Sequence, residues 1–207
     1  MKIRHLILAT PALLVLLQIG CSTNSGSSTT ANGATCNPKS PPTCNPLDYT
    51  SLDSTPVSFT SDLFEPIIRP TCNSSACHGI SLAQRTIDYP GAGLYLGPAI
   101  TDTSTTDDAA LRTMIVAELL GNSETAPSTK IVVPNQPANS FLMLKLTGCQ
   151  NMANLTCMVQ SPDVSETDTG CGDTMPAPCF AEISNLTLTD AQIATFARWI
   201  AQGANAD

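Results

Sequence analysis

Four stretches of the chain carry apolar residues at the spacing of a helix that faces a core. They are residues 61–70, 107–121, 138–148 and 188–203. The alternation of apolar and polar residues that is typical of strands is nearly absent. The pattern therefore predicts a mostly helical protein with long loops between its helices.

The clearest of these helices is the last, LTDAQIATFARWIAQG. Thr189 is placed to cap its first turn, and Gly203 is placed to stop it. Its predicted apolar face consists of Ile193, Phe196, Ala197 and Ile200, with Trp199 at the edge.

The first helix, SDLFEPIIRP, is expected to be capped by Ser61 or Asp62 and closed by Pro70, with Pro66 near its first turn. Its apolar stripe consists of Leu63, Phe64, Ile67 and Ile68.

Acidic residues and glycines bound the two middle helices. The acidic pair at 107–108 opens one helix and Gly121 stops it, while Gly148 ends the short apolar helix at 138–148. Residues 149–180 hold four cysteines and several prolines but little periodicity. We expect them to form a loop stapled by disulfides.

The N-terminus has the pattern of an export signal. Lys2 and Arg4 precede an apolar run from Leu6 to Ile19, which predicts a secretory signal peptide at residues 1–20. The following Cys21 resembles the lipidated cysteine of bacterial lipoproteins, although Gln18 stands where an aliphatic residue is usual. We therefore predict a lipid anchor at Cys21 on a membrane facing the periplasm or cell surface; plain secretion is the alternative.

Composition divides the rest of the chain into two parts. Residues 22–58 are rich in Ser, Thr, Asn and Pro and poor in large apolar residues, which predicts a disordered tether. The predicted organisation is thus a signal peptide at 1–20, a lipid-anchored tether at 21–58 and a folded domain at 59–207.

The chain is acidic. Residues 1–20 contain two of the nine Lys and Arg residues and none of the 17 Asp and Glu residues, so the exported chain has a formal charge of −10. Nucleic acids require a basic surface, and the charge argues against them as partners.

Six cysteines are candidates for disulfides in an oxidising compartment. They fall into three local pairs with seven residues between partners, although a nested arrangement of the last four also satisfies the spacing. The pairs are Cys36 with Cys44, Cys149 with Cys157, and Cys171 with Cys179.

The remaining two cysteines lie in TCNSSACHG, residues 71–79. Three interpretations compete for Cys72, Cys77 and His78. One is a disulfide beside an unrelated histidine. Another is a zinc or iron–sulfur site, which needs about four ligands, whereas His78 is the only histidine after the signal peptide.

The third interpretation is covalent haem. Two thiols bond to the two vinyl groups of the porphyrin, and the histidine that follows the second cysteine binds the iron. The usual attachment motif has two residues between its cysteines, and this one has four.

The wider sequence resembles the cytochrome c family, in particular small bacterial c-type lipoproteins with long attachment motifs. The similarity covers roughly residues 59–204. It rests on the order of five segments: LFEPIIRPTCNSSACHG, GLYL, VVPNQPANSFLMLKLTG, a late MP pair, and FARWIAQGA. The resemblance implies a cytochrome c-like helical domain in which the first and last helices pack across each other.

The resemblance also implies the site residues. Cys72 and Cys77 would hold one haem, His78 would be the proximal ligand of its iron, and Met175 would be the distal ligand. In the sequence, Met175 stands midway between Cys171 and Cys179, so a disulfide there would order the ligand loop.

Other methionines compete with Met175 as the distal ligand. Met114 and Met143 lie inside apolar helices, where core packing is their expected role. Met152 and Met158 lie in or beside the other stapled loop and are open alternatives.

These assignments predict a monohaem cytochrome that carries single electrons between redox proteins, tethered to a membrane by its N-terminal lipid. No catalytic constellation is apparent, and we do not expect an enzyme. The alternatives are a haemless, disulfide-stabilised lipoprotein that acts as a binding or structural module, and a haem protein with an open site for a small gas.

Overall fold

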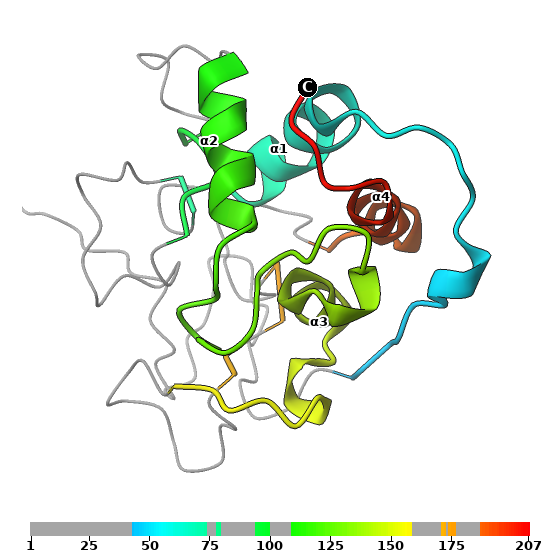
Figure 1. The fold of residues 1–207 in the computed structure, drawn as a ribbon, viewed down its shortest axis with the longest axis vertical. Coiled ribbons are helices and arrows are strands. Elements are labelled where there is room, and N and C mark those ends of the chain that lie inside the picture. Colours follow the sequence, from blue (N-terminus) through cyan, green and yellow to red (C-terminus); the bar gives the residue numbers. More distant parts are fainter. Residues whose placement is uncertain are drawn as a thin grey trace, which may run out of the picture.

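A computed structural model describes residues 43–73, 78–79, 94–99, 109–158, 171–172, 174–176 and 187–207. Figure 1 shows its helices, with η marking 3₁₀ and π helices: η1 (Tyr49–Ser51), η2 (Phe59–Ile68), α1 (Arg69–Thr71), α2 (Ala109–Leu119), η4 (Pro137–Asn139), α3 (Phe141–Thr147), η5 (Gln150–Met152) and α4 (Asp190–Ala201). Within these ranges the only β pairing is one bridge between Asn122 and Lys130. The predicted helical class is confirmed for the described part of the chain.

The first helix begins earlier and ends later than the sequence predicted. Ser58 caps η2, since its Oγ accepts the N–H of Ser61 at 3.0 Å and its own N–H donates to Asp62 at 2.8 Å. Pro66 therefore lies in the helix interior, where η2 is wound as a π helix. Pro70 does not close the helix, because α1 continues to Thr71. The predicted apolar stripe is confirmed, as all four of its residues are buried.

The last helix begins and ends as predicted. Thr189 and Gln192 form a reciprocal capping box, and Gly203 adopts a φ of +103° just after the helix. Trp199, which was expected at the edge of the apolar face, is instead 2 % exposed, and its Nε1 donates to the carbonyl of Asn205 at 2.9 Å. A satisfied indole N–H allows the whole ring to be buried.

Of the two middle helices, α2 agrees with the sequence pattern, whereas the single helix expected at 138–148 is divided at Ser140 into η4 and α3. α2 buries Ile115, Val116 and Leu119, and α3 ends at Gly148, whose φ of +70° suits a left-handed helix cap. The acidic pair at 107–108 lies outside the described residues.

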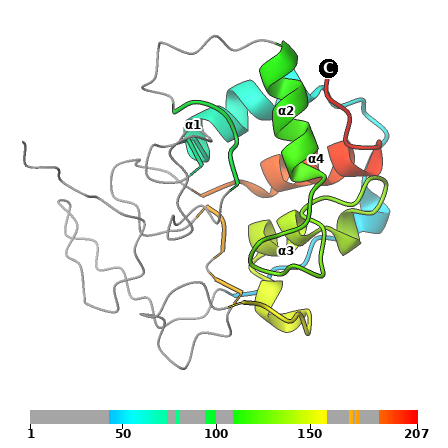
Figure 2. The ribbon, with the colours of Figure 1, turned by 60° about the vertical axis from the view of Figure 1, so that its left-hand side comes forward.

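The helices share one apolar core. In both Figure 1 and Figure 2, α4 lies between η2 and α3. The ring of Phe59 on η2 lies 5.3 Å from that of Trp199 on α4, and 6.1 Å from that of Phe64. The core is completed by helix residues and by Val132 from the loop after α2; the helix residues include Leu63, Ile115, Leu119, Met143, Leu146, Phe196 and Ile200.

The N-terminal boundary of the folded domain differs from the prediction. Residues 43–58, which we expected to belong to the tether, cover the outside of α3 and α4. The N–H of Asn45 donates to Thr147 at 2.9 Å, and Gln202 on α4 bonds both the N–H of Val57 and the carbonyl of Thr55. The segment also packs four partly buried side chains against the core: Leu47, Tyr49, Leu52 and Val57.

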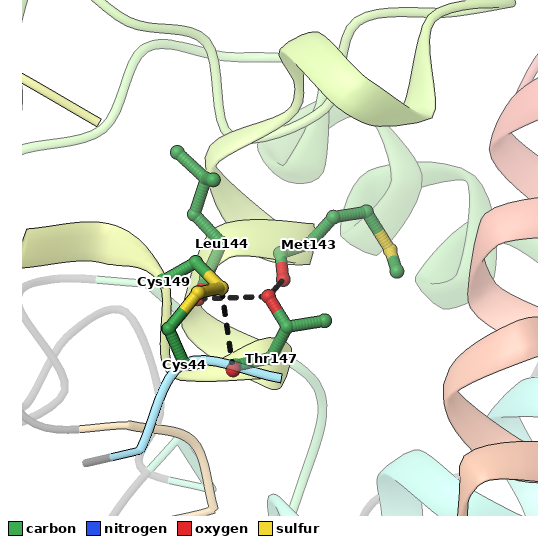
Figure 3. Close-up of a disulfide and its surroundings, with 5 residues drawn as sticks. All are labelled: Cys44, Met143, Leu144, Thr147 and Cys149. Carbon is green, nitrogen blue, oxygen red and sulfur yellow. Dashed lines mark hydrogen bonds between the residues drawn. A yellow bond between two sulfur atoms is a disulfide. The ribbon is translucent and has the colours of Figure 1, made fainter. Parts of the chain in front are cut away.

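A disulfide fixes the start of this segment to the end of α3. Cys44 bonds to Cys149, 105 positions away, and Figure 3 shows the bridge next to the last turn of α3. Thr147 in that turn donates its hydroxyl to the carbonyl of Met143 at 2.8 Å. The expected pairing of Cys44 with Cys36 is therefore wrong.

The second described disulfide joins Cys157 to Cys171. It excludes the local pairs Cys149–Cys157 and Cys171–Cys179, and it agrees with one bond of the nested alternative. Cys36 and Cys179 lie outside the described residues. Cysteine spacing failed as a guide because the chain brings distant segments together at the end of α3.

Loss of the long-range disulfide should destabilise the protein more than loss of the short one. Replacement of both Cys44 and Cys149 by serine frees a loop of 105 positions, against 14 for Cys157 and Cys171. The chain-entropy model gives about 4–5 kcal/mol for the first and about 3 kcal/mol for the second. Urea unfolding without reductant measures both. A smaller loss for the Cys44–Cys149 variant would contradict this account of the domain boundary.

An exposed ion pair also fastens the N-terminal segment to α4. Both carboxylate oxygens of Asp53 accept hydrogen bonds from Arg198, at 2.9 and 3.0 Å. Hydrogen bonds from Thr55, and then those from Arg198, lower the pKa of Asp53 from 3.8 to about 2. Because the folded pKa is depressed, the stabilisation is complete above the unfolded pKa near 4 and is lost as the pH falls through about 2.

Asp53→Asn should therefore reduce stability at pH 5 and have little effect at pH 2. Urea midpoints of the wild type and the variant, measured from pH 5 to pH 2, show whether the difference in stability disappears as the pH falls. Arg198→Gln is the matched control: it leaves the Thr55 bonds, the larger cause of the shift, and should retain most of the pH dependence. If the urea midpoints of the wild type and Asp53→Asn differ by the same amount from pH 5 to pH 2, the stabilisation does not come from the ionised carboxylate of Asp53.

Candidate functional site

The candidate site begins where α1 ends. The N–H of Cys72 donates to the carbonyl of Ile68 at 2.7 Å, and the half-buried Cys72 side chain lies at the edge of the core. Cys77 lies outside the described residues. Attachment of a cofactor through Cys72 and Cys77, and the alternative bridge between them, both stay predictions.

The backbone of His78 is held on both sides. Its N–H donates to the carbonyl of Cys72 at 3.1 Å, which joins the two described ends of the motif. Its carbonyl accepts the N–H of Leu96 at 3.0 Å, and the carbonyl of Gly79 accepts that of Ala99 at 3.1 Å. The motif therefore lies alongside residues 94–99, the region of the GLYL segment noted in the sequence.

The imidazole of His78 has a defined orientation. Its Nδ1 lies 2.9 Å from the carbonyl oxygen of Leu94. Because a carbonyl can only accept, the hydrogen bond places the ring proton on Nδ1, and in the neutral ring Nε2 then carries the lone pair. Histidines that bind metals typically donate their second nitrogen to a carbonyl or carboxylate in this way.

Asn73 is a part of the site that the sequence analysis missed. Asn73 directly follows Cys72, and its side chain is 0 % exposed. Its Nδ2 donates to the carbonyl of Leu96 at 2.8 Å, and its Oδ1 is buried with no hydrogen-bond partner within the described residues. Asn73 and His78 thus fix the same neighbouring segment. The described part of the motif offered only one signal for this role, an amide side chain directly after Cys72.

Gly97 makes room for this amide. A Cβ at Gly97 would lie 3.0 Å from Nδ2 of Asn73 and 3.2 Å from side-chain carbons of Phe64 and Ile115. Its φ of +112° is also one that other residues rarely adopt. The GLYLG segment therefore approaches η2 and α2 as closely as its backbone permits.

Met175 is half-buried and packs against the core. Its N–H donates to the carbonyl of Lys145 on α3 at 3.0 Å. Because Cys171 bonds to Cys157, Met175 is not the midpoint of a loop closed by Cys171 and Cys179. The loop is held instead by the Cys157 bridge and by α3.

The competing methionines occupy different environments. Met143 is fully buried in the core, as expected, while Met114 is half-buried. The side chains of Met152 and Met158 are 73 % and 54 % exposed. Met175 alone among the described loop methionines packs against the core, as do Cys72 and Leu94. Cys72 and Met175 therefore both pack against the border of the same core.

Two buried polar side chains of α3 and η5 also escaped the sequence analysis. Lys145 is 8 % exposed, and its Nζ donates to the carbonyl of Cys171 at 2.8 Å. Gln150 is fully buried, and its Nε2 donates to the carbonyl of Gly172 at 3.0 Å. The sequence contained one signal for the buried Lys145, which is the only charged residue in the apolar run FLMLKLTG. Burial of a charge requires a specific partner.

A groove in the described part of the chain lies away from this site. It has a volume of about 610 Å³ and runs between the N-terminal segment, η4 and α4. Its polar side chains bond to one another or to nearby backbone: Asp53 to Arg198, Asn139 to Gln136, and Gln202 to residues 55 and 57. These bonds give the groove a structural role in docking the N-terminal segment.

Two searches were confined to the described ranges. Among those residues, no three His, Cys, Asp or Glu side chains are grouped so that they could hold a metal ion. No helix there is long and apolar enough to cross a membrane. Residues 1–20 and Cys21, the predicted export signal and anchor, lie outside those ranges.

Comparison of the chain with models of protein families, with curated proteins and with solved structures found no match.

Removal of the Asn73 anchor should destabilise the site. Asn73→Ala leaves the buried carbonyl of Leu96 without its donor and opens a small cavity, which costs about 1–3 kcal/mol. Asn73→Asp, which puts an acceptor against that carbonyl, should cost at least as much. Urea unfolding measures the loss, and Asn139→Ala, which removes the amide of an exposed residue, is the control. Equal, small effects at both positions would contradict an anchoring role for Asn73.

Proposed function

We propose that the protein is a membrane-tethered monohaem c-type cytochrome that carries single electrons between periplasmic or surface redox proteins. In this proposal Cys72 and Cys77 attach the haem, Nε2 of His78 binds its iron, and Met175 is the opposite ligand. The observation that carries the proposal is the hydrogen bond between Nδ1 of His78 and the carbonyl of Leu94, because it fixes the tautomer and ring orientation that an iron ligand requires.

The surroundings of these residues suit a large, flat, apolar group. Cys72, Leu94 and Met175 all border the apolar core, and both ligand side chains are half-buried. The packing of η2 against α4 is the helix contact that the resemblance to cytochromes c implies. Each proposed ligand is also tied by backbone hydrogen bonds to a segment that itself packs on the core.

The chemistry of the ligand set favours electron transfer. When bound, haem supplies an iron centre that gains or loses one electron. A histidine and a methionine together leave no iron position for a substrate, and methionine raises the reduction potential. The tasks of this chain's own residues are to orient the imidazole, to hold the thioether in place and to surround both with apolar side chains.

The export signal and the acidic charge complete the proposal. A lipid at Cys21 would hold the domain near a membrane, and a formal charge of −10 would favour redox partners with basic docking surfaces. The residues between Cys21 and the disulfide at Cys44 would set how far the domain reaches from that membrane.

Haem attachment is tested by expression in a host that matures c-type cytochromes. We expect the wild type to show the reduced-state visible spectrum of haem and, under denaturing conditions, a mass increased by one covalently bound haem. His78→Ala should alter the spectrum, because it removes the proximal ligand. Colourless wild-type protein of unmodified mass would refute the proposal and favour the haemless binding or structural module, which the two disulfides alone could stabilise.

The same preparation tests the distal ligand. Met175→Ala should allow carbon monoxide to bind the reduced protein and should lower the reduction potential, since the thioether no longer competes for iron. Met152→Ala is the matched control, because its side chain is exposed. Carbon monoxide binding by the wild type would point instead to a haem protein with an open site.

A further inference from the structure

We propose that Lys145 is a positioning residue for Met175. Its backbone carbonyl and its buried ammonium together hold residues 171–175 against α3, and this contact determines how firmly the methionine stays on the iron. The inference rests on the proposed function, because it assumes that Met175 is an iron ligand.

The backbone contact follows from where α3 ends. The last four carbonyls of an α helix have no partner within the helix, and Lys145 contributes one of them. That carbonyl accepts the N–H of Met175 at 3.0 Å. The methionine is therefore fastened at its own backbone, which leaves only its side-chain torsions to be fixed on ligation.

The side chain of Lys145 fastens the other end of the same segment. Its Nζ donates to the carbonyl of Cys171 at 2.8 Å and lies 5.8 Å from the centre of the Phe141 ring. Gly172 permits this approach, because a Cβ there would lie 3.3 Å from Nζ. A cation in the last turn of α3 is also favoured by the helix dipole.

Further links hold the segment between these two contacts. Gln150 donates to the carbonyl of Gly172, and Cys171 bonds to Cys157. A thioether is a weak ligand. It binds iron more firmly when its loop is already ordered in the folded protein, because ligation then costs little further entropy. Lys145 bonds both Cys171 and Met175, the two ends of this segment, through different groups.

Lys145→Met tests the role of the ammonium. The substitution keeps a long, apolar side chain in the core and leaves the backbone bond to Met175 in place. Imidazole, added to the oxidised haem protein, competes with Met175 for iron and is followed by its absorption change. We expect its apparent affinity to rise about tenfold, which corresponds to about 1.4 kcal/mol, the size of a hydrogen bond from a charged group.

Lys130→Met is the matched control. Lys130 also donates to a backbone carbonyl, that of Leu120 at 3.1 Å, but its side chain is exposed and makes no described contact with residues 171–175. Its imidazole affinity should equal that of the wild type. Lys145→Arg, which retains the charge, should recover part of the wild-type value.

Gly172→Ala is a second variant in case Lys145→Met does not accumulate. The new Cβ would lie 3.3 Å from Nζ and push the ammonium away from its position, and the φ of +66° would strain the alanine. Both effects loosen the segment, so imidazole affinity should again rise. Unchanged affinity in a folded Lys145→Met or Gly172→Ala protein would overturn the inference and leave the proposed function intact. The inference also fails if the wild type contains no haem. It fails equally if Met175→Ala binds imidazole with the wild-type affinity, because Met175 is then not an iron ligand.

Discussion

The end of α3 must satisfy backbone carbonyls that have no partner within the helix, and much of the described structure depends on how it does so. The partners come from three parts of the chain: the N–H of Asn45 bonds Thr147, that of Met175 bonds Lys145, and those of Gly148 and Cys149 bond Leu144. The Cys44–Cys149 disulfide lies at the same place. The C-terminal end of α3 thus joins both the N-terminal segment and the loop that carries Met175 to the core.

This arrangement explains why composition misplaced the domain boundary. Residues 43–58 have too few large apolar side chains to fold alone, which is why the sequence predicted a tether. They do not need to fold alone. Their backbone groups bond to partners on and next to α3 and α4, and the disulfide lowers part of the entropy cost of ordering the segment. A composition argument cannot include such partners, because they are distant in the sequence.

The parts of the fold that could be predicted are those fixed by local spacing. The apolar stripe of η2 and the capping box of α4 depend on residues within a few positions of each other, and the sequence displays both. The disulfide pairing, the inward turn of Asn73 and the buried ammonium of Lys145 depend on contacts across 14 to more than 100 positions. For the candidate site, the sequence suggested Cys72, His78 and Met175, whose chemistry stays a prediction, and it gave no sign of the contacts that Asn73 and Lys145 make beside them.

The two sides of the proposed haem site are held by separate parts of the molecule. The histidine side includes Cys72, Asn73 and His78, and the last two bond the segment 94–99. The methionine side is built on α3, through Lys145 and the Cys157–Cys171 bridge. Because the described residues that tie the two sides together are mainly the shared apolar core, a change at α3 can loosen the methionine without disturbing the imidazole. In the proposed site, the contacts of α3 with the loop of Met175 would therefore influence whether the protein is an electron carrier or a haem protein with an open site.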